Sequence, residues 1–257
     1  MNTLPVGLPP ELRALTGADA WEPVTVGESG ATVHRTDTLY LKTVPRAEAP
    51  ALFGEKERLR WLAGRVPVPR VLYWGSDDER AYLLTSRLIG VDASQAAALR
   101  DPPLLCDLLA RGLRALHQLP IADCPFDASL RVRLREAQAR LEAGLVDEDD
   151  FDAARRGRAA SDLYRELEAT RPTREDLVVT HGDYCLPNII LDGKYVAGFV
   201  DVGGLGIADR HQDLALCVRS LKRNIGERWG AVFLEAYGYR PIDAAKIEYY
   251  QLLDEFF

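Results

Sequence analysis

Residues 181–188 read HGDYCLPN and lie between two short apolar, strand-like runs. Asp183 and Asn188 therefore project from a loop at strand ends. A second carboxylate, Asp201, follows the apolar run AGFV and is itself followed by Val and Gly. Carboxylate and amide oxygens suit Mg²⁺, which also takes phosphate oxygens and water. A carboxylate apart from the metal can orient an attacking hydroxyl group and accept its proton.

These two motifs together predict a phosphoryl-transfer site. Asp183 is expected to act on the acceptor, while Asn188 and Asp201 hold Mg²⁺. Either motif alone would be an ordinary turn, but both occur in the order that a kinase-like site requires. The expected cofactors are therefore ATP and Mg²⁺, and the expected mechanism is direct in-line transfer through positioning and charge neutralisation.

The front part of the chain supplies a matching nucleotide site. Residues 27–33, GESGATV, form a Gly-containing turn between two strands, which lets backbone N–H groups approach phosphate. Lys42 lies in the apolar strand that follows, and an inward-facing lysine there needs a phosphate or carboxylate partner. Glu55, early on the next helix, can supply that carboxylate, with Glu57 as the rival partner.

Apolar patterning divides the chain into a β-rich front lobe and a mostly helical back lobe with a small β insert. We expect a two-lobed α+β, protein-kinase-like fold: a nucleotide-binding lobe at residues 1–89, a catalytic and substrate-binding lobe at 90–257, and a hinge at about 85–91. The active site is expected in the cleft between the lobes. The predicted strands are Val24–Val26, Thr32–Thr36, Thr38–Val44, Arg70–Tyr73, Ala81–Ser86, Val178–Thr180, Ile189–Leu191 and Lys194–Val200, the last two joined by a hairpin at Asp192-Gly193. The predicted helices are residues 47–64, Pro102–Leu119, Ser129–Gly144, Ser161–Thr170, Arg210–Lys222, Gly226–Tyr237 and Asp243–Phe256.

Composition excludes several classes of protein. The 257 residues include 32 basic and 39 acidic ones, a net charge of −7, which argues against nucleic-acid binding and suits a cationic small substrate. No run of about 18 apolar residues occurs, which argues against a membrane partner. The N-terminus lacks the pattern of a secretory signal, and the four cysteines lack metal-ligand spacing. We therefore expect a cytoplasmic protein without a zinc site, with monomer or weak dimer left open.

The chain resembles the aminoglycoside 3′-phosphotransferases, antibiotic-resistance kinases with a protein-kinase-like fold. Three segments carry the resemblance: VVTHGDYCLPNIILDGKYVAGFVDVG at 178–203, ADRHQDLALCVRS at 208–220 and YYQLLDEFF at 249–257. The last matters most, because kinase-like folds in general do not share it. The resemblance runs from Ser29 to Phe257. It implies transfer of the γ-phosphoryl group of ATP to the 3′-hydroxyl of kanamycin- or neomycin-type aminoglycosides, which confers resistance.

The resemblance also implies residue roles. Asp183 is the catalytic base or hydroxyl-orienting carboxylate, Asn188 and Asp201 hold Mg²⁺, and His181 and Asp213 support the catalytic loop. The implied nucleotide-binding residues are Ser29 over the β-phosphate, Tyr40 near adenine, Lys42 on the α- and β-phosphates, Glu55 holding Lys42, and the backbones of Ser86 and Leu88 at the adenine edge.

A polycationic substrate calls for carboxylates more than for aromatic surface. The back part of the chain offers the acidic run DEDDFD at 147–152 and the pair Asp254-Glu255, with the α-carboxylate of Phe257 close behind. The resemblance implies a substrate site made of Asp152, Asp183, Asp254, Glu255 and Phe257.

The sequence departs from the family at four positions. Gly204 stands where an arginine usually follows the DxG motif. Arg223 and Asn224 stand where acidic residues often help to bind the substrate, and Ala153 replaces another frequent carboxylate. These changes remove negative charge from the expected sugar site and put the drug range in question.

Two alternatives stay open. The first is a small-molecule kinase of the same fold with a choline-like, macrolide or sugar acceptor, although the acidic C-terminal block argues against a neutral macrolide. The second is a non-catalytic nucleotide-binding protein, although such a protein has no need of Asp183 as a base.

Overall fold

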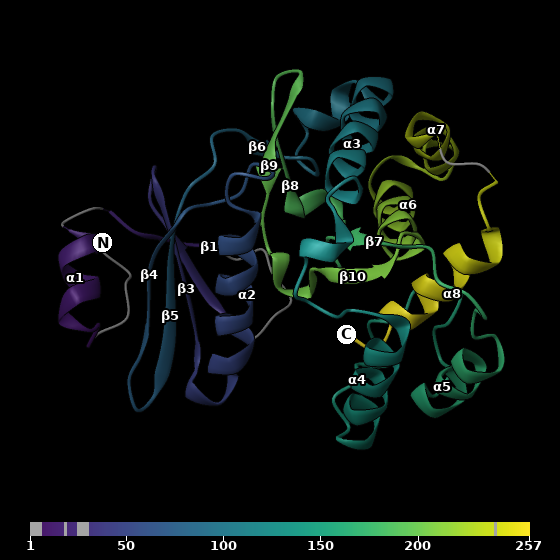
Figure 1. The fold of residues 1–257 in the computed structure, drawn as a ribbon, viewed down its shortest axis with the longest axis horizontal. Helices are drawn as coiled ribbons and strands as arrows, with labels where there is room; N and C mark the ends of the chain where they lie inside the picture. The colour runs from purple at the N-terminus through teal and green to yellow at the C-terminus, as the bar shows by residue number, and fades with distance from the viewer. Residues whose placement is uncertain (1–6, 18–19, 25–30, 239–240) are drawn as a thin grey trace. The chain divides into compact units, whose positions relative to one another are not determined.

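The computed structural model describes residues 7–17, 20–24, 31–238 and 241–257 (Figure 1). The chain divides into two compact units, one of residues 1–90 with 197–203 and one of 91–196 with 204–257. The first contains an antiparallel sheet and the second is mostly helical, so the predicted α+β, two-lobed fold class is confirmed. The return of 197–203 to the first unit has no counterpart in the sequence prediction.

The first unit is built on a five-stranded sheet in the order β1-β2-β3-β5-β4. Its elements are α1 (Pro10–Thr16), β1 (Glu22–Val24), β2 (Thr32–Arg35), β3 (Leu39–Pro45), α2 (Ala49–Leu62), β4 (Val71–Ser76) and β5 (Arg80–Ser86). Side chains alternate between the two faces of a strand. Leu41 packs with Leu84 and with Leu12 of α1 in one apolar cluster. Lys42, the next residue along β3, therefore points to the opposite face, where it meets Glu55 of α2.

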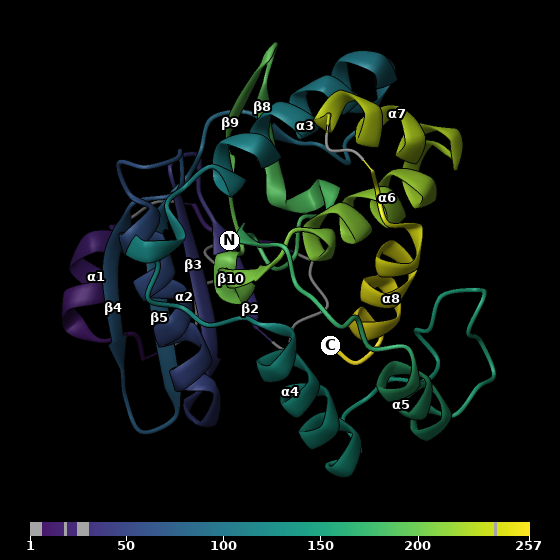
Figure 2. The ribbon, with the colours of Figure 1, turned by 45° about the vertical axis from the view of Figure 1, so that its right-hand side comes forward.

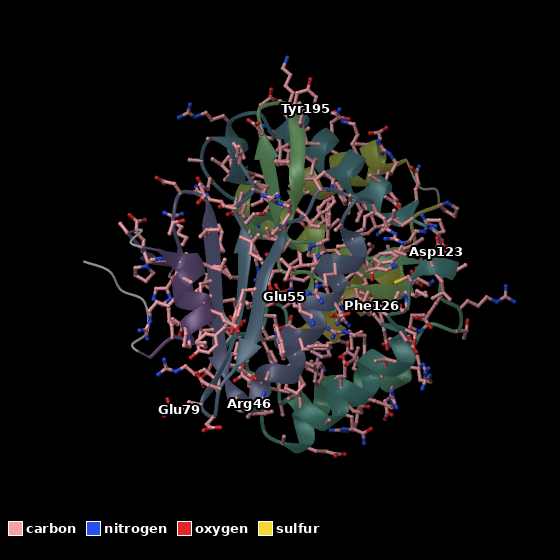
Figure 3. All side chains as sticks on the ribbon, turned by 60° about the vertical axis from the view of Figure 1, so that its left-hand side comes forward. Arg46, Glu55, Glu79, Asp123, Phe126 and Tyr195 are labelled. Carbon is pink, nitrogen blue, oxygen red and sulfur yellow. The ribbon has the colours of Figure 1, made fainter. Side chains whose placement is uncertain are left out.

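Helix α2 carries the acidic partner of Lys42 to that face. Pro50 stands in its first turn, where a missing N–H costs nothing. Leu52, Leu59 and Leu62 are buried, and Glu55 is buried with them. Since positions three and four apart share a helix face, Glu55 is directed inward with the leucines (Figure 3).

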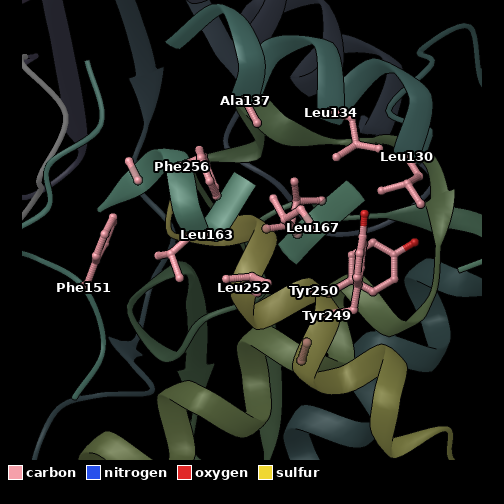
Figure 4. Close-up of a cluster of buried hydrophobic side chains, with 13 residues drawn as sticks. Leu130, Leu134, Ala137, Phe151, Leu163, Leu167, Tyr249, Tyr250, Leu252 and Phe256 are labelled. Carbon is pink, nitrogen blue, oxygen red and sulfur yellow. The ribbon is translucent and has the colours of Figure 1, made fainter. Parts of the chain in front are cut away.

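The second unit is mostly helical (Figure 2). Helix α6 packs against α7 and α8, and α3 packs against α7. One core gathers residues from α4, α5 and α8 together with Phe151 and with Ala215 of α6 (Figure 4). The helices are α3 (Pro102–His117), α4 (Leu130–Glu142), α5 (Ala160–Ala169), α6 (His211–Ile225), α7 (Arg228–Tyr237) and α8 (Ala244–Asp254).

Two small sheets frame the catalytic loop. One pairs β7 (Leu177–Thr180) with β10 (Gly206–Asp209), and the other has the order β6-β8-β9, with β6 (Val91–Asp92), β8 (Ile189–Asp192) and β9 (Tyr195–Phe199). Residues 181–188 thus connect a strand of one sheet to a strand of the other. The predicted hairpin at Asp192-Gly193 is confirmed, since β8 and β9 are neighbours.

The remaining regular segments are single turns of 3₁₀ helix: η1 (Arg46–Glu48), η2 (Ala98–Arg100), η3 (Ile121–Asp123), η4 (Leu186–Asn188) and η5 (Val202–Gly204). The sequence analysis missed α1, β6 and β10, each too short to show a clear periodicity. Within the described part of the chain, no helix has both the length and the apolar character needed to cross a membrane.

Candidate active site

Asp183 and Asn188 form one hydrogen-bonded unit in the loop between β7 and β8. The side-chain amide of Asn188 donates to Asp183 Oδ2 at 2.7 Å and to the Asp183 carbonyl oxygen at 3.0 Å. The turn η4 sets this spacing, because it folds the five-residue interval back on itself. Both amide hydrogens of Asn188 are thereby used, and its amide oxygen is left as an acceptor. The carboxylate of Asp183 is held in one orientation, as a base or hydroxyl-orienting group must be.

A buried carboxylate at the start of α6 fixes the backbone of the same loop. Asp213 accepts the N–H of His181 at 2.7 Å and the N–H of Gly182 at 2.9 Å. These charge-assisted bonds are fully buried, where such bonds are strongest. The expected role of Asp213 is confirmed. His181 is also fully buried, and its Nδ1 lies 3.3 Å from the Asp183 N–H, which fits an orienting role.

His117 extends this support, and sequence reasoning did not single it out. Its Nε2 lies 3.0 Å from Asp213 Oδ2 and its Nδ1 lies 2.8 Å from the Tyr237 hydroxyl. His117 and Asp213 are almost a hundred positions apart, so no local motif reports the contact. Asp213 is thus oriented from two sides, by the loop it holds and by α3.

Glycine is required at position 182 by its surroundings. Its φ is +89°, and a Cβ there would stand 2.1 Å from the Gly204 carbonyl oxygen, far inside van der Waals contact. Gly204, in contrast, could carry a Cβ that meets Gly182 Cα at 3.3 Å, a tight but adjustable contact. Glycine at position 204 therefore reduces crowding against the catalytic loop, but the packing does not require a glycine there.

In the first unit, Lys42 holds two carboxylates. Its Nζ lies 2.9 Å from Glu55 Oε2 and 2.9 Å from Asp201 Oδ1. Glu57 instead pairs with Lys56 and Arg60, so Glu55 is the partner of Lys42. Burial disfavours the Lys42 ammonium, but the charges of Glu55 and Asp201 outweigh it and raise the pKa of Lys42 above its ordinary value. The lysine therefore carries a positive charge throughout the neutral range.

Asp201 has an unusual backbone conformation for an aspartate. Its φ is +57°, the left-handed region that non-glycine residues seldom adopt. Such a conformation is held only where the surroundings impose it. Lys42 engages Oδ1, and half of the Asp201 side chain is exposed. The Asp201 carboxylate is a hard oxygen donor, the type of ligand that Mg²⁺ prefers.

The other predicted nucleotide residues lie in the first unit. Tyr40 sits in β3 opposite Thr85, partly exposed, and hydrogen-bonds Arg35. The Ser86 N–H donates to the Arg70 carbonyl oxygen at 2.9 Å. This N–H is therefore already used, and a nucleotide base would have to hydrogen-bond other groups at this position. Leu88 follows β5 and is half-buried. Ser29 lies outside the described residues.

The predicted substrate carboxylates gather in the second unit, each with an arginine. The Asp152 carboxylate accepts from Arg223, Asp254 accepts from Arg219, and Glu255 accepts from Arg155 at 3.0 Å. The backbone N–H of Asp152 also donates to Glu255 at 3.1 Å, which ties the run 147–152 to the end of the chain. Sequence reasoning located the acids but missed Arg155 and Arg219. We call these six side chains the acid–arginine cluster.

Electrostatics differ within the cluster. Burial works against the charge of Asp152, but Arg223 and Arg219 hold the pKa of that carboxyl below its ordinary value. Burial raises the pKa of Glu255, whose side chain is only 3% exposed. Phe257 is held separately. The Arg133 guanidinium lies 3.6 Å from its ring centroid, and Arg140 donates to its carbonyl oxygen at 3.4 Å.

Residues 20–250 match the model of the phosphotransferase enzyme family. The chain belongs to this family. The phosphotransferase is 42% identical to an aminoglycoside 3′-phosphotransferase of Streptomyces fradiae, over 92% of this chain and 95% of that one.

Solved structures of relatives agree with this assignment. The crystal structure of an aminoglycoside 3′-phosphotransferase of type VIII superposes with a TM-score of 0.84 at 38% identity, covering 96% and 97% of the two chains. Aminoglycoside phosphotransferase APH(3″)-Id of Streptomyces rimosus, in complex with ADP and streptomycin, superposes with a TM-score of 0.84 at 34% identity over 95% of each chain. Relatives of this phosphotransferase thus include both 3′ and 3″ enzymes at comparable identity.

Proposed function

We propose that this phosphotransferase transfers the γ-phosphoryl group of ATP to the 3′-hydroxyl of kanamycin- or neomycin-type aminoglycosides and so confers resistance. The coarser activity, aminoglycoside phosphorylation, follows from the family and from relatives with that name at about 40% identity. The observation that carries the chemistry is the fixed Asp183–Asn188 pair on a loop whose backbone is held by Asp213.

Each residue has a defined task in this proposal. Asp183 accepts a hydrogen bond from the acceptor hydroxyl, orients it for in-line attack and takes its proton late, since a loose transition state leaves little proton to remove early. Lys42 binds the α- and β-phosphates, and Glu55 keeps its ammonium in place. Asn188 and Asp201 would hold Mg²⁺, which supplies charge neutralisation on the phosphates when bound. Ser29, Tyr40, Ser86 and Leu88 remain the proposed nucleotide contacts.

The acid–arginine cluster supports a polycationic acceptor. Asp152 and Glu255 come together from segments a hundred residues apart, with Asp254 next to Glu255 in the chain, and a multiply charged amino sugar could pair with such carboxylates. Asp183 and Phe257 complete the proposed substrate site. A neutral acceptor could donate hydrogen bonds to these carboxylates but would form no ion pairs with them.

Product analysis tests the assignment of the hydroxyl. The protein is incubated with Mg²⁺, ATP and either kanamycin B or tobramycin, its 3′-deoxy analogue. We expect drug-dependent ATP turnover and one added phosphate for kanamycin B, with none for tobramycin, and NMR of the product should locate the phosphate at the 3′ oxygen. Equal turnover of both drugs would exclude the 3′ position.

A 3″ activity is the second candidate, because APH(3″)-Id superposes closely and its structure contains streptomycin. Streptomycin in the same assay separates the two. Turnover of streptomycin with kanamycin B left unmodified would replace the 3′ assignment by a 3″ one.

The role of Asp183 is tested by Asp183→Ala with Asp192→Ala as the matched control, since Asp192 is an exposed carboxylate at the end of β8. Asp183→Ala should lower kcat by about 10²-fold or more while nucleotide affinity changes little. Asp192→Ala should leave both unchanged. Turnover of Asp183→Ala within tenfold of the parent would refute the base assignment.

A further inference from the structure

Arg223 is the exposed member of the acid–arginine cluster. Its side chain is 50% exposed, against 10% for Arg155 and 18% for Arg219. Arg223 lies near the end of α6 and donates to Asp152 Oδ1. It is therefore the guanidinium that a ligand arriving from solvent can displace most easily.

The two inner arginines have a structural task. Arg155 joins Glu255 to the Glu248 carbonyl oxygen, at 3.0 Å and 3.4 Å. Arg219 joins Asp254 to Asp152, and burial of Arg219 is outweighed by these carboxylates, which raise its pKa. Removing Arg155 would leave the almost fully buried Glu255 without its guanidinium, and removing Arg219 would leave the half-buried Asp254 without its own. Arg223, whose partner Asp152 also lies 3.7 Å from Arg155 and from Arg219, can leave without that consequence.

Arg223 also completes a charge balance. Within the described residues, the cluster holds three carboxylates and three guanidinium groups, which sum to zero. An ammonium group of the substrate must therefore compete with an internal guanidinium for each carboxylate of the cluster. Without Arg223 the same cluster would carry one negative charge, at its exposed end.

The cluster lies within reach of the catalytic loop. Ser220, next to Arg219 on α6, accepts the N–H of Leu186 in that loop at 3.0 Å. The Cys185 N–H, one residue before Leu186, donates to the Asp183 carbonyl oxygen at 3.0 Å, which connects Asp183 with this contact. A substrate bound through Asp183 is therefore near the charges that Arg223 balances.

We propose that Arg223 is a specificity-determining residue that occupies Asp152 as a substrate ammonium group would, and so disfavours aminoglycosides with an amine at that position relative to congeners with a hydroxyl there. This inference rests on the proposed function. Arg223 acts on substrate binding, through Asp152, and takes no part in the transfer step.

The test compares Arg223→Gln with Lys222→Gln. Both variants remove one positive charge from the end of α6, but Lys222 pairs with Glu227 and touches none of the cluster carboxylates. The substrates are two pairs that differ in one amine or hydroxyl group: neomycin and paromomycin at the 6′ position, and kanamycin B and kanamycin A at the 2′ position. KM and kcat are measured for each by ATP turnover, with nucleotide Kd as a check.

Arg223→Gln should lower KM for the amine member of at least one pair by about three- to fivefold, the effect of freeing one partly exposed ion pair, with a smaller gain for its hydroxyl partner. Its kcat and nucleotide Kd should stay within twofold. Lys222→Gln should change KM for both members alike and by less than twofold. This pattern separates a local exchange of partners from a change in overall charge.

The remaining outcomes are decisive as well. If the parent phosphorylates aminoglycosides and Arg223→Gln leaves every KM unchanged or higher, the inference falls and the proposed function stands. Turnover by Arg223→Gln alone would establish the inference and restrict the proposed function to the variant. If no protein turns over any aminoglycoside, both are overturned.

Discussion

The charged groups of the two units are balanced differently. In the first unit one ammonium, Lys42, holds two carboxylates, and Asp201 keeps 51% of its side chain exposed. In the second unit three guanidinium groups match three carboxylates whose side chains are between 3% and 21% exposed. An unequal group retains negative charge that a further cation can neutralise, as Mg²⁺ would. An equal group retains none, so a cationic ligand must displace a cation already there. In the proposed function, the group around Lys42 can therefore take up an added cation. The acid–arginine cluster instead favours some cationic substrates over others.

The largest expected effect comes from replacing Lys42, the one ammonium that holds both Glu55 and Asp201. Lys42→Met should lower kcat/KM by about 100-fold or more, because it removes a charge aimed at the phosphates and leaves Glu55 buried beside Asp201 without a counter-ion. Steady-state kinetics with Mg-ATP and kanamycin B measures this. Lys42→Arg should recover only part of the loss, since the planar guanidinium does not reproduce a point charge. Full activity of Lys42→Met would remove Lys42 from the nucleotide site.

The inner part of the balanced cluster should govern stability. Arg155→Met leaves Glu255 almost fully buried without its guanidinium, and it should lower the free energy of unfolding by about 3 kcal/mol at neutral pH. Urea denaturation measures this loss. The double variant with Glu255→Gln should recover part of the loss, because the uncompensated charge is gone. A loss below about 0.5 kcal/mol in the single variant would mean that the pair contributes no more than an exposed one.

Acid should weaken the outer part of the cluster. The pKa of Asp152 lies below its ordinary value of 3.8, so the stabilisation that its ion pairs provide is complete above that pH and is lost as the pH falls further. The parent should melt a few degrees above Asp152→Asn at pH 7, and the two melting temperatures should converge below about pH 4. A difference in Tm that is already lost between pH 5 and pH 4, above the ordinary pKa, would contradict the depressed pKa.

The smallest effect sharpens the assignment of the partner of Lys42. Glu57→Gln should change kcat/KM by less than about twofold, because Glu57 pairs with Lys56 and Arg60 on the exposed side of α2. Glu55→Gln, measured beside it, should cost about tenfold or more, because Glu55 holds the ammonium directly. Equal changes in kcat/KM for the two variants would show that activity depends on the overall negative charge of α2 and not on the contact of Glu55 with Lys42.

Local chemistry made part of this site predictable. The spacing of Asp183 and Asn188 and the position of Lys42 in an apolar strand are visible in the sequence because each depends on neighbours a few residues away. The hairpin at Asp192-Gly193 can be predicted from the sequence for the same reason.

Contacts across long intervals were not predictable from the same patterns. Arg219 meets Asp254 and His117 meets Asp213 only after the helices pack, and nothing in either local segment encodes the pairing. The acids of the substrate site were found by composition and resemblance, but their neutralisation by arginines was foreseen only as the departure at Arg223. Helix α1 and strand β10 are so short that their apolar residues show no repeating pattern in the sequence.

Gly182 and Gly204, which lie against each other at the catalytic loop, differ in how well they tolerate substitution. At position 182 any other residue is shut out by the Gly204 carbonyl oxygen, so mutation there ends in loss of the loop geometry. Position 204 needs a displacement of only a few tenths of an ångström to carry a side chain. A glycine codon becomes an arginine codon by one base change, so the cation that the family usually has there is a single mutation away. Of the two positions, 204 is therefore the one at which a substitution is compatible with the geometry of the loop.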